Sequence, residues 1–115
     1  MPAHNILSQL QSLVAYSRLE KAATATLTNK ELMGHRYIDA NHASAAIALT
    51  LPTAGNGNKG AIVTFTNYAA AVLTVVDAAG FGGGGNDTVT LAQGECCEIH
   101  SDGAKWFELH NEPAA

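Results

Sequence analysis

The chain has 115 residues, which is the size of one domain and leaves no room for a second independent core. Its formal net charge is −4 and only 14% of its residues are charged, with no basic stripe, so binding driven by the phosphate backbone of a nucleic acid is not expected. Hydrophobic residues make up 47%, but 21 residues are alanine and only 6% are aromatic, which predicts closely spaced sheets with small and β-branched core side chains.

The first segment has the pattern of an amphipathic helix. Apolar residues recur there at helical spacing, namely Ile6, Leu10, Leu13 and Val14. With Asn5 as the N-cap, this pattern predicts a helix over roughly residues 6–22. Three roles stay open for it: packing on its own domain, docking as an arm on another subunit or partner, or a flexible tail. Neither a signal peptide nor an apolar stretch of about 20 residues is found, so no membrane span is expected.

From Ala23 onward the sequence consists of short strand patterns separated by turn residues. KELMG predicts one short helical turn closed by Gly34, and HRYIDA predicts a strand. AAIALTLP alternates with period two and is stopped by Pro52. GAIVTFTN, AVLTVVDA, DTVTLAQGE, CCEIHSDG and KWFELHN continue the series. Because no helical crossover separates the strands from residue 46 onward, we expect an antiparallel β-sandwich or barrel, similar to a jelly roll or β-tulip, over residues 23–111, with a short tail at 112–115.

The glycine run tests whether the protein binds a nucleotide. Gly80, Gly82 and Gly85 have the G-x-G-x-x-G spacing of a dinucleotide-binding loop. Such a loop must open a helix whose N-terminus holds the pyrophosphate, whereas here a strand pattern, TVTL, follows. No Lys-Ser or Lys-Thr pair completes a P-loop either. We therefore expect a structural connection anchored by Phe81, and no cofactor.

Cysteine and histidine residues are the other candidates for chemistry. Adjacent cysteines seldom bridge each other, and Cys96 and Cys97 lack the spacing of a zinc site. Strand alternation places Cys97 beside Ile99 toward the core and His100 on the opposite face. The five histidines lie in no ligand or triad motif, and no G-x-S-x-G nucleophile motif is present. We expect no catalytic residue and no metal site; a small enzyme or metal protein is an interpretation that depends on these side chains alone.

The end of the chain contains the strongest turn signal. Asp102-Gly103 between two strand patterns predicts a β-hairpin. Trp106, the only tryptophan, is either a core residue or an exposed aromatic platform for a sugar or a protein.

The order of these motifs resembles a module common in structural proteins of tailed bacteriophages. In that module a TLP strand leads through a KG turn to a strand ending in Asn, and a VTV strand precedes a glycine-rich loop. TLxxGE, a strand, SDG and an aromatic strand follow. The matching stretches are LTLPTAGNGNKGAIVTFTN, LTVVDAAGFGGGG and TVTLAQGECCEIHSDGAKWFEL, so the resemblance covers roughly residues 24–110.

The resemblance implies a structural role in the virion rather than catalysis. A small single module favours a capsid decoration (cement) protein, a homotrimer that binds the major capsid protein of the same phage on the outer capsid surface and stabilises the shell. The alternative is a head-fibre, tail-fibre or receptor-binding module that contacts the host surface. No nucleic acid and no membrane are expected as partners.

Contact residues differ between these two roles. For the decoration protein we expect contacts from the segment 1–22 and from the loop GNGNKG, through Leu10, Leu13, Val14, Asn56, Asn58 and Lys59. For the host-binding module we expect the aromatic platforms Tyr68, Phe81 and Trp106.

Overall fold

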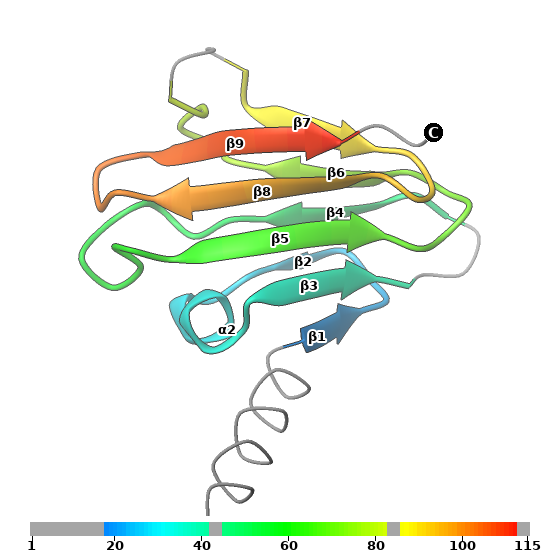
Figure 1. Ribbon diagram of the computed structural model, residues 1–115, viewed down its shortest axis with the longest axis horizontal. Helices are drawn as coiled ribbons and strands as arrows, with labels where there is room; N and C mark the ends of the chain where they lie inside the picture. The colour runs from blue at the N-terminus through cyan, green and yellow to red at the C-terminus, as the bar shows by residue number, and fades with distance from the viewer. Residues whose placement is uncertain (1–17, 42–44, 83–85, 113–115) are drawn as a thin grey trace, which may run out of the picture.

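Two β-sheets packed face to face form the protein in the computed structural model, which describes residues 18–41, 45–82 and 86–112 (Figure 1). The five-stranded sheet has the order β1 (Arg18–Lys21), β3 (Tyr37–Ala40), β5 (Ile62–Asn67), β8 (Cys96–Ser101) and β9 (Trp106–Glu112). The four-stranded sheet has the order β2 (Ala25–Thr26), β4 (Ile47–Thr50), β6 (Leu73–Val76) and β7 (Thr88–Leu91). The predicted mainly β sandwich is therefore confirmed, as an open sandwich and not a closed barrel.

The first six strands alternate between the two sheets along the chain. As a result β1, β3 and β5 pair in parallel in one sheet, and β2, β4 and β6 pair in parallel in the other. Only the later pairs β6–β7, β5–β8 and β8–β9 are antiparallel. The expectation of purely antiparallel sheets is wrong for this reason. Parallel neighbours need a long crossover, and here a strand of the opposite sheet supplies it in place of a helix.

Strand alternation fills the space between the sheets with apolar side chains. Ile47, Leu49 and Leu51 all face inward, as their period-two spacing predicts. The largest fully buried side chains, Trp106 and Phe65, come from the five-stranded sheet. Since both sheets contribute to one continuous cluster of buried residues, neither sheet has a core of its own.

The chain enters the sandwich earlier than the sequence predicts. Arg18–Lys21 form β1, so the expected helix does not extend to residue 22, and the remainder of that prediction lies outside the described residues. Strand β1 is fixed by its parallel pairing with β3, which a helix-like apolar spacing does not reveal.

The short helix α2 (Asn29–Gly34) lies where KELMG predicts a helical turn. A capping box starts it: the Thr28 hydroxyl accepts from the Glu31 backbone N–H, and the Glu31 carboxylate accepts from the Thr28 backbone N–H. Leu32 anchors the helix in the core.

The glycine run has the structural role that the sequence indicates. Phe81 is buried, and the N–H of Gly82 donates to the Trp106 carbonyl at 2.8 Å, which ties the β6–β7 connection to β9. A Cβ at Gly82 would overlap the Phe107 ring, so this close approach requires glycine. Strand β7 follows the loop, so the helix of a dinucleotide-binding site is replaced by a strand.

Candidate interaction surface

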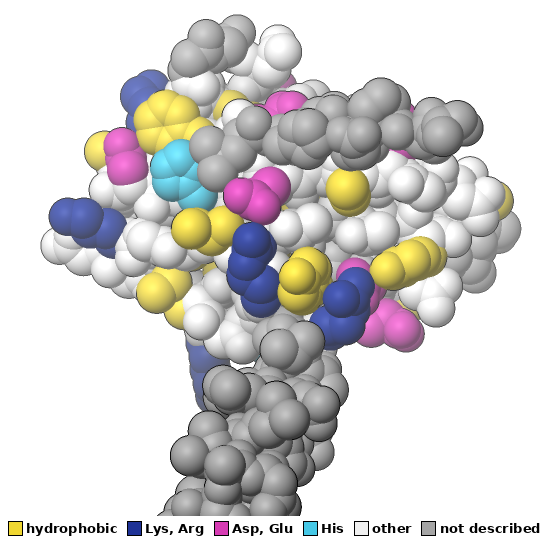
Figure 2. Space-filling view, in the orientation of Figure 1, with side chains coloured by type: hydrophobic (Ala, Val, Ile, Leu, Met, Phe, Trp, Pro, Cys, Tyr) yellow, Lys and Arg dark blue, Asp and Glu magenta, His cyan; other side chains and the backbone are white. Residues whose placement is uncertain are grey.

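Charged and aromatic side chains gather on the outer face of the five-stranded sheet. We call six of them the arginine–tyrosine cluster: Arg18, Arg36, Tyr37, Asp39, Tyr68 and Glu98. Strand alternation explains the placement, because Ile38 and Ala40 of β3 are buried while Tyr37 and Asp39 between them point outward. Figure 2 shows basic, acidic and hydrophobic side chains mixed over this face.

Arg18 forms one half of the cluster. Its Nε and one terminal nitrogen donate to the two carboxylate oxygens of Asp39 at 2.9 and 3.0 Å, a bidentate ion pair. The same terminal nitrogen donates to the Tyr68 hydroxyl at 3.3 Å. The hydrogen bond that the guanidinium donates to Asp39 raises its pKa, and the group stays charged at all working pH values. Arg18 on β1 is thus held in place by Asp39 on β3 and by Tyr68 in the loop that follows β5.

Arg36 forms the other half. It donates to the Ile62 carbonyl at 3.4 Å, to the Thr64 hydroxyl at 3.2 Å and to the Glu98 carboxylate at 3.3 Å. The Tyr37 ring lies between the two guanidinium groups, with Arg18 Cζ at 4.5 Å and Arg36 Cζ at 5.6 Å from its centroid.

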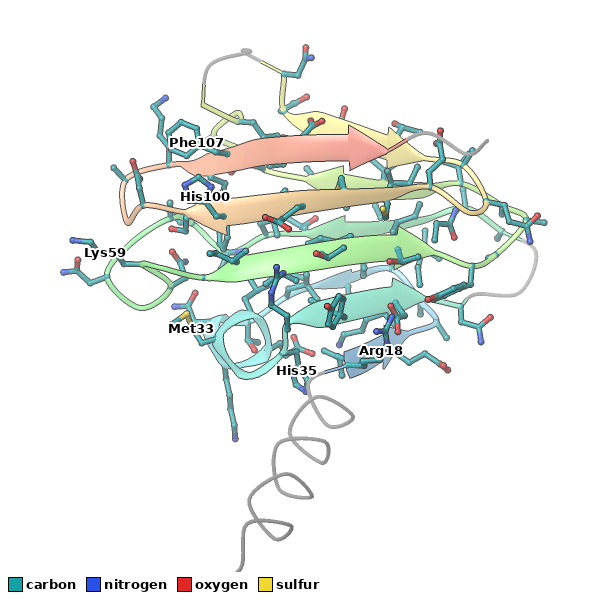
Figure 3. The ribbon with its side chains drawn as sticks, in the orientation of Figure 1. Arg18, Met33, His35, Lys59, His100 and Phe107 are labelled. Carbon is teal, nitrogen blue, oxygen red and sulfur yellow. The ribbon has the colours of Figure 1, made fainter. Side chains whose placement is uncertain are left out.

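Apolar and aromatic groups surround the cluster. Ile62 is 45% exposed and Tyr68 is 51% exposed, which is unusual for side chains of this size. His100 stacks on Phe107 with ring centroids 5.3 Å apart, and Figure 3 shows the pair on neighbouring strands β8 and β9. Ordered arginine, tyrosine and exposed aliphatic groups are the composition of protein–protein contact centres. Since both guanidinium groups already bind carboxylates, the surface is suited to a protein partner rather than to a free anion.

The predicted capsid-contact residues divide into three groups. Leu10, Leu13 and Val14 lie outside the described residues. Asn56 and Lys59 are exposed on the loop between β4 and β5, and Lys59 points away from the sheets in Figure 3. Whether these residues contact a partner stays a prediction.

Asn58 corrects that prediction, because its side chain is fully buried. Its amide nitrogen donates to Asn29 and to the Thr53 carbonyl, both at 2.9 Å, and its oxygen accepts from the Ser101 hydroxyl at 2.7 Å. In turn-rich sequence a polar residue is expected at the surface, but here the loop folds around it and satisfies its hydrogen bonds internally. Asn58 therefore organises the loop and leaves no side chain for a partner.

Two of the three expected aromatic platforms are buried. Trp106 is a core residue whose Nε1 donates to the Pro52 carbonyl at 2.7 Å, and Phe81 is buried in the same hydrophobic cluster. Tyr68 alone of the three is exposed.

The cysteine and histidine side chains that the structure describes do not gather at one site. Cys97 is buried, as alternation predicts, and loss of solvation raises its pKa to about 12, so its thiol stays protonated. Among the described residues, no group of three or more His, Cys, Asp or Glu side chains is placed to hold a metal ion. Within the same part of the chain, no helix is both long and apolar enough to cross a membrane.

Sequence reasoning missed the arginine–tyrosine cluster. Arg18 and Asp39 are 21 residues apart and Arg18 and Tyr68 are 50 residues apart, so only the parallel pairing of β1 with β3 and of β3 with β5 brings them together. The available signal was local: the alternation of Tyr37 and Asp39 with apolar residues marks an outward-facing pair.

Comparisons with known proteins give little support for any function. The chain matches no protein-family model and no curated protein sequence. A solved structure similar to it is the fragment StcE(132-251) from enterohemorrhagic E. coli, with a TM-score of 0.47 and 18% identity over 79% of this chain and 89% of that chain. A likeness at this level carries no argument about what the chain does.

Proposed function

We propose that this protein is a capsid decoration protein of a tailed bacteriophage, which binds the outer capsid surface as a homotrimer and stabilises the shell. The observation that carries the proposal is the order of its strand and turn motifs, which resembles that of phage structural modules over roughly residues 24–110. The proposed partner is the major capsid protein of the same phage.

The fold supports the proposal at the level of its parts. The TLP motif lies at the end of β4, and β5 ends at Asn67. The TLxxGE motif leads from β7 into β8, and the SDG turn joins β8 to β9, with Gly103 at a φ of 91°. These four motifs of the resemblance therefore coincide with the strands and turns that they require.

The arginine–tyrosine cluster supplies a surface for the capsid partner. A decoration protein binds through many modest contacts repeated by symmetry, so each copy needs only a small ordered patch. Tyr68 and Ile62 offer exposed apolar area, while Arg18 offers hydrogen-bond donors that are already held in one geometry by Asp39. The exposed loop residues Asn56 and Lys59 provide a second contact region at one end of the sandwich.

A fibre or receptor-binding module is the second candidate. Tyr68 favours it, because an exposed tyrosine beside the paired Arg18 and Asp39 resembles the aromatic and polar groups that hold a sugar. Burial of Phe81 and Trp106 removes the other two platforms that this role would use.

Copy number in purified virions distinguishes the two roles. Quantitative mass spectrometry against the major capsid protein should give a ratio near one to one, or a large fraction of it, for a decoration protein. A few copies per hundred capsid subunits would favour the fibre role instead. Absence from the virion would remove both.

Binding to undecorated shells tests the surface. The double variant Arg18→Ala/Tyr68→Ala should bind at least about tenfold more weakly in a sedimentation assay, since truncated contact-centre residues cost more than about 1 kcal/mol each. Lys30→Ala is the matched control, because it removes one positive charge from an exposed position on α2. Equal binding of the double variant and the wild type would exclude the cluster as the capsid contact.

A further inference from the structure

We propose that the outer face of the four-stranded sheet, together with the free edge of β7, binds a second copy of this chain. This inference deepens the proposed function, which requires several copies to associate, and it names the surface through which they do so. Its test uses the chain alone, so the outcome does not depend on whether the chain binds a capsid.

Small uncharged side chains cover this outer face. In register across the sheet, one row contains Thr26, Thr50, Val76 and Thr88. The next row contains Ala48, Thr74 and Thr90. Their neighbours along each strand point into the core, so these rows form the whole outward surface of the four strands.

None of the residues in β2, β4, β6 and β7 is Asp, Glu, Lys, Arg or His, on either face. The five-stranded sheet is different, because its strands carry several charged side chains. Arg18, Asp39 and Glu98 are among them. In a protein with a formal net charge of −4, two copies repel each other least where they present no charge. An uncharged face brings no charge of its own against a second copy, whereas a charged partner would find no counter-charge there.

The four sheet edges show where a strand of another copy can add. Natural edge strands are protected by charge, by shortness or by a covering segment. Strand β1 carries Arg18, Glu20 and Lys21, and β2 is only two residues long. At β9, the Gly82 N–H covers the Trp106 carbonyl.

Strand β7 has none of these protections in the described part of the chain. It ends the four-stranded sheet, its sequence is TVTL, and its two outward threonines are exposed. Because β7 forms one border of the uncharged face, its unpaired backbone groups and the threonine rows make one continuous surface (Figure 1). Two independent features, an unprotected edge and an uncharged face, therefore indicate the same partner, a second copy of this chain.

Sedimentation velocity and light scattering of the full chain test this inference. The wild type should form a discrete oligomer, and Thr74→Arg at the centre of the face should weaken association by about 100-fold or more, since an arginine there would be buried without a partner. A complex of three chains also agrees with the proposed homotrimer. A complex of two chains supports this surface while contradicting the threefold arrangement.

Thr66→Arg is the matched control. Thr66 is also a half-buried threonine on the outer face of a central strand, but in β5 of the other sheet, so this variant should associate like the wild type. Thermal melting of each variant checks that it folds. If Thr74→Arg does not fold, Thr90→Lys at the exposed edge position tests the same surface with less strain.

Three results would overturn the inference. The first is a monomeric wild type at every concentration tested. The second is unchanged association of folded Thr74→Arg or Thr90→Lys. The third is loss of association in Thr66→Arg with retention in Thr74→Arg, which would place the contact on the other sheet.

Discussion

The two sheets of this sandwich share one core but differ completely on their outer faces. Inward-facing side chains of both sheets are aliphatic or aromatic and pack together in one cluster. Outward-facing side chains of the five-stranded sheet include charged and aromatic residues, whereas those of the four-stranded sheet are threonine, alanine and valine. The difference teaches that the shared core determines the fold and leaves the two outer faces free to differ. We propose a capsid partner for one face and a second copy of the chain for the other.

The largest expected effect comes from breaking the shared core. Trp106→Ala should destabilise the protein by about 3–5 kcal/mol, because it removes a fully buried ring and leaves the Pro52 carbonyl without its indole donor. Urea unfolding measures this loss. Since Trp106 belongs to the five-stranded sheet and Pro52 follows β4 of the other sheet, both sheets should unfold in one transition.

Phe107→Ala provides the comparison on the same strand. Phe107 is only half-buried and packs on His100 at the outer face, so its loss should cost clearly less. Equal losses in the two variants, or two separate transitions, would show that the sheets do not share one cooperative core.

The next largest expected effect comes from removing the hydrogen bonds of Asn67, which link β5 of one sheet to β7 of the other. Asn67 at the end of β5 donates from its amide nitrogen to the carbonyls of Ala71 and Leu91, both at 2.9 Å, and accepts from the Ala69 N–H. Asn67→Leu should cost about 1–3 kcal/mol despite the similar size, because buried backbone groups lose their partners. Denaturant unfolding measures it, and a stability equal to that of the wild type would mean that water replaces the side chain.

Much of this architecture could be predicted from the sequence. Period-two alternation located the inward residues of β4, and Asp102-Gly103 located the β8–β9 hairpin. Pairing direction could not be predicted, because parallel and antiparallel strands have the same side-chain period. Arg18 was assigned to a helix for a related reason: a four-residue strand held by its neighbour has little pattern of its own.

The candidate surface was less accessible to sequence reasoning. Its contacts join Arg18 to residues 21 and 50 positions away, so they depend on the topology that alternation cannot give. Asn58 shows the opposite failure, since its type and its turn-rich surroundings indicate exposure while four polar partners bury it. In both cases the placement of the side chain depends on which segments, distant in sequence, lie next to each other in the fold.

A third effect concerns the loop that closes one side of the sandwich. Gly82→Ala should destabilise the protein by about 1–3 kcal/mol, because the new methyl group would overlap the Phe107 ring of the five-stranded sheet. Gly34→Ala is the matched control, since nothing lies within 4 Å of a Cβ at that position and alanine suits a helix better. Thermal melting compares the two. A Gly82→Ala protein as stable as the control would mean that the loop shifts away from β9 freely.

The smallest expected effect comes from the ion pair between Glu31 of α2 and Lys21 of β1, the edge strand of the five-stranded sheet. Glu31 accepts from Lys21 Nζ of β1 at 2.5 Å and from the Thr28 N–H at 3.0 Å, and these bonds, Lys21 first, lower its pKa. A lowered pKa means that the stabilisation is complete above the ordinary glutamate pKa of about 4.3 and is lost as the pH falls through the lower folded-state pKa. Glu31→Gln should therefore be less stable than the wild type at neutral pH, by up to about 1 kcal/mol because both side chains of the ion pair are partly exposed.

Urea unfolding at several pH values measures this difference, which should shrink toward zero in acid. Glu20→Gln controls for the loss of one negative charge on the neighbouring exposed position of β1. A difference between Glu31→Gln and the wild type that persists unchanged below the ordinary glutamate pKa would assign the stabilisation to the shape of the side chain rather than to its charge.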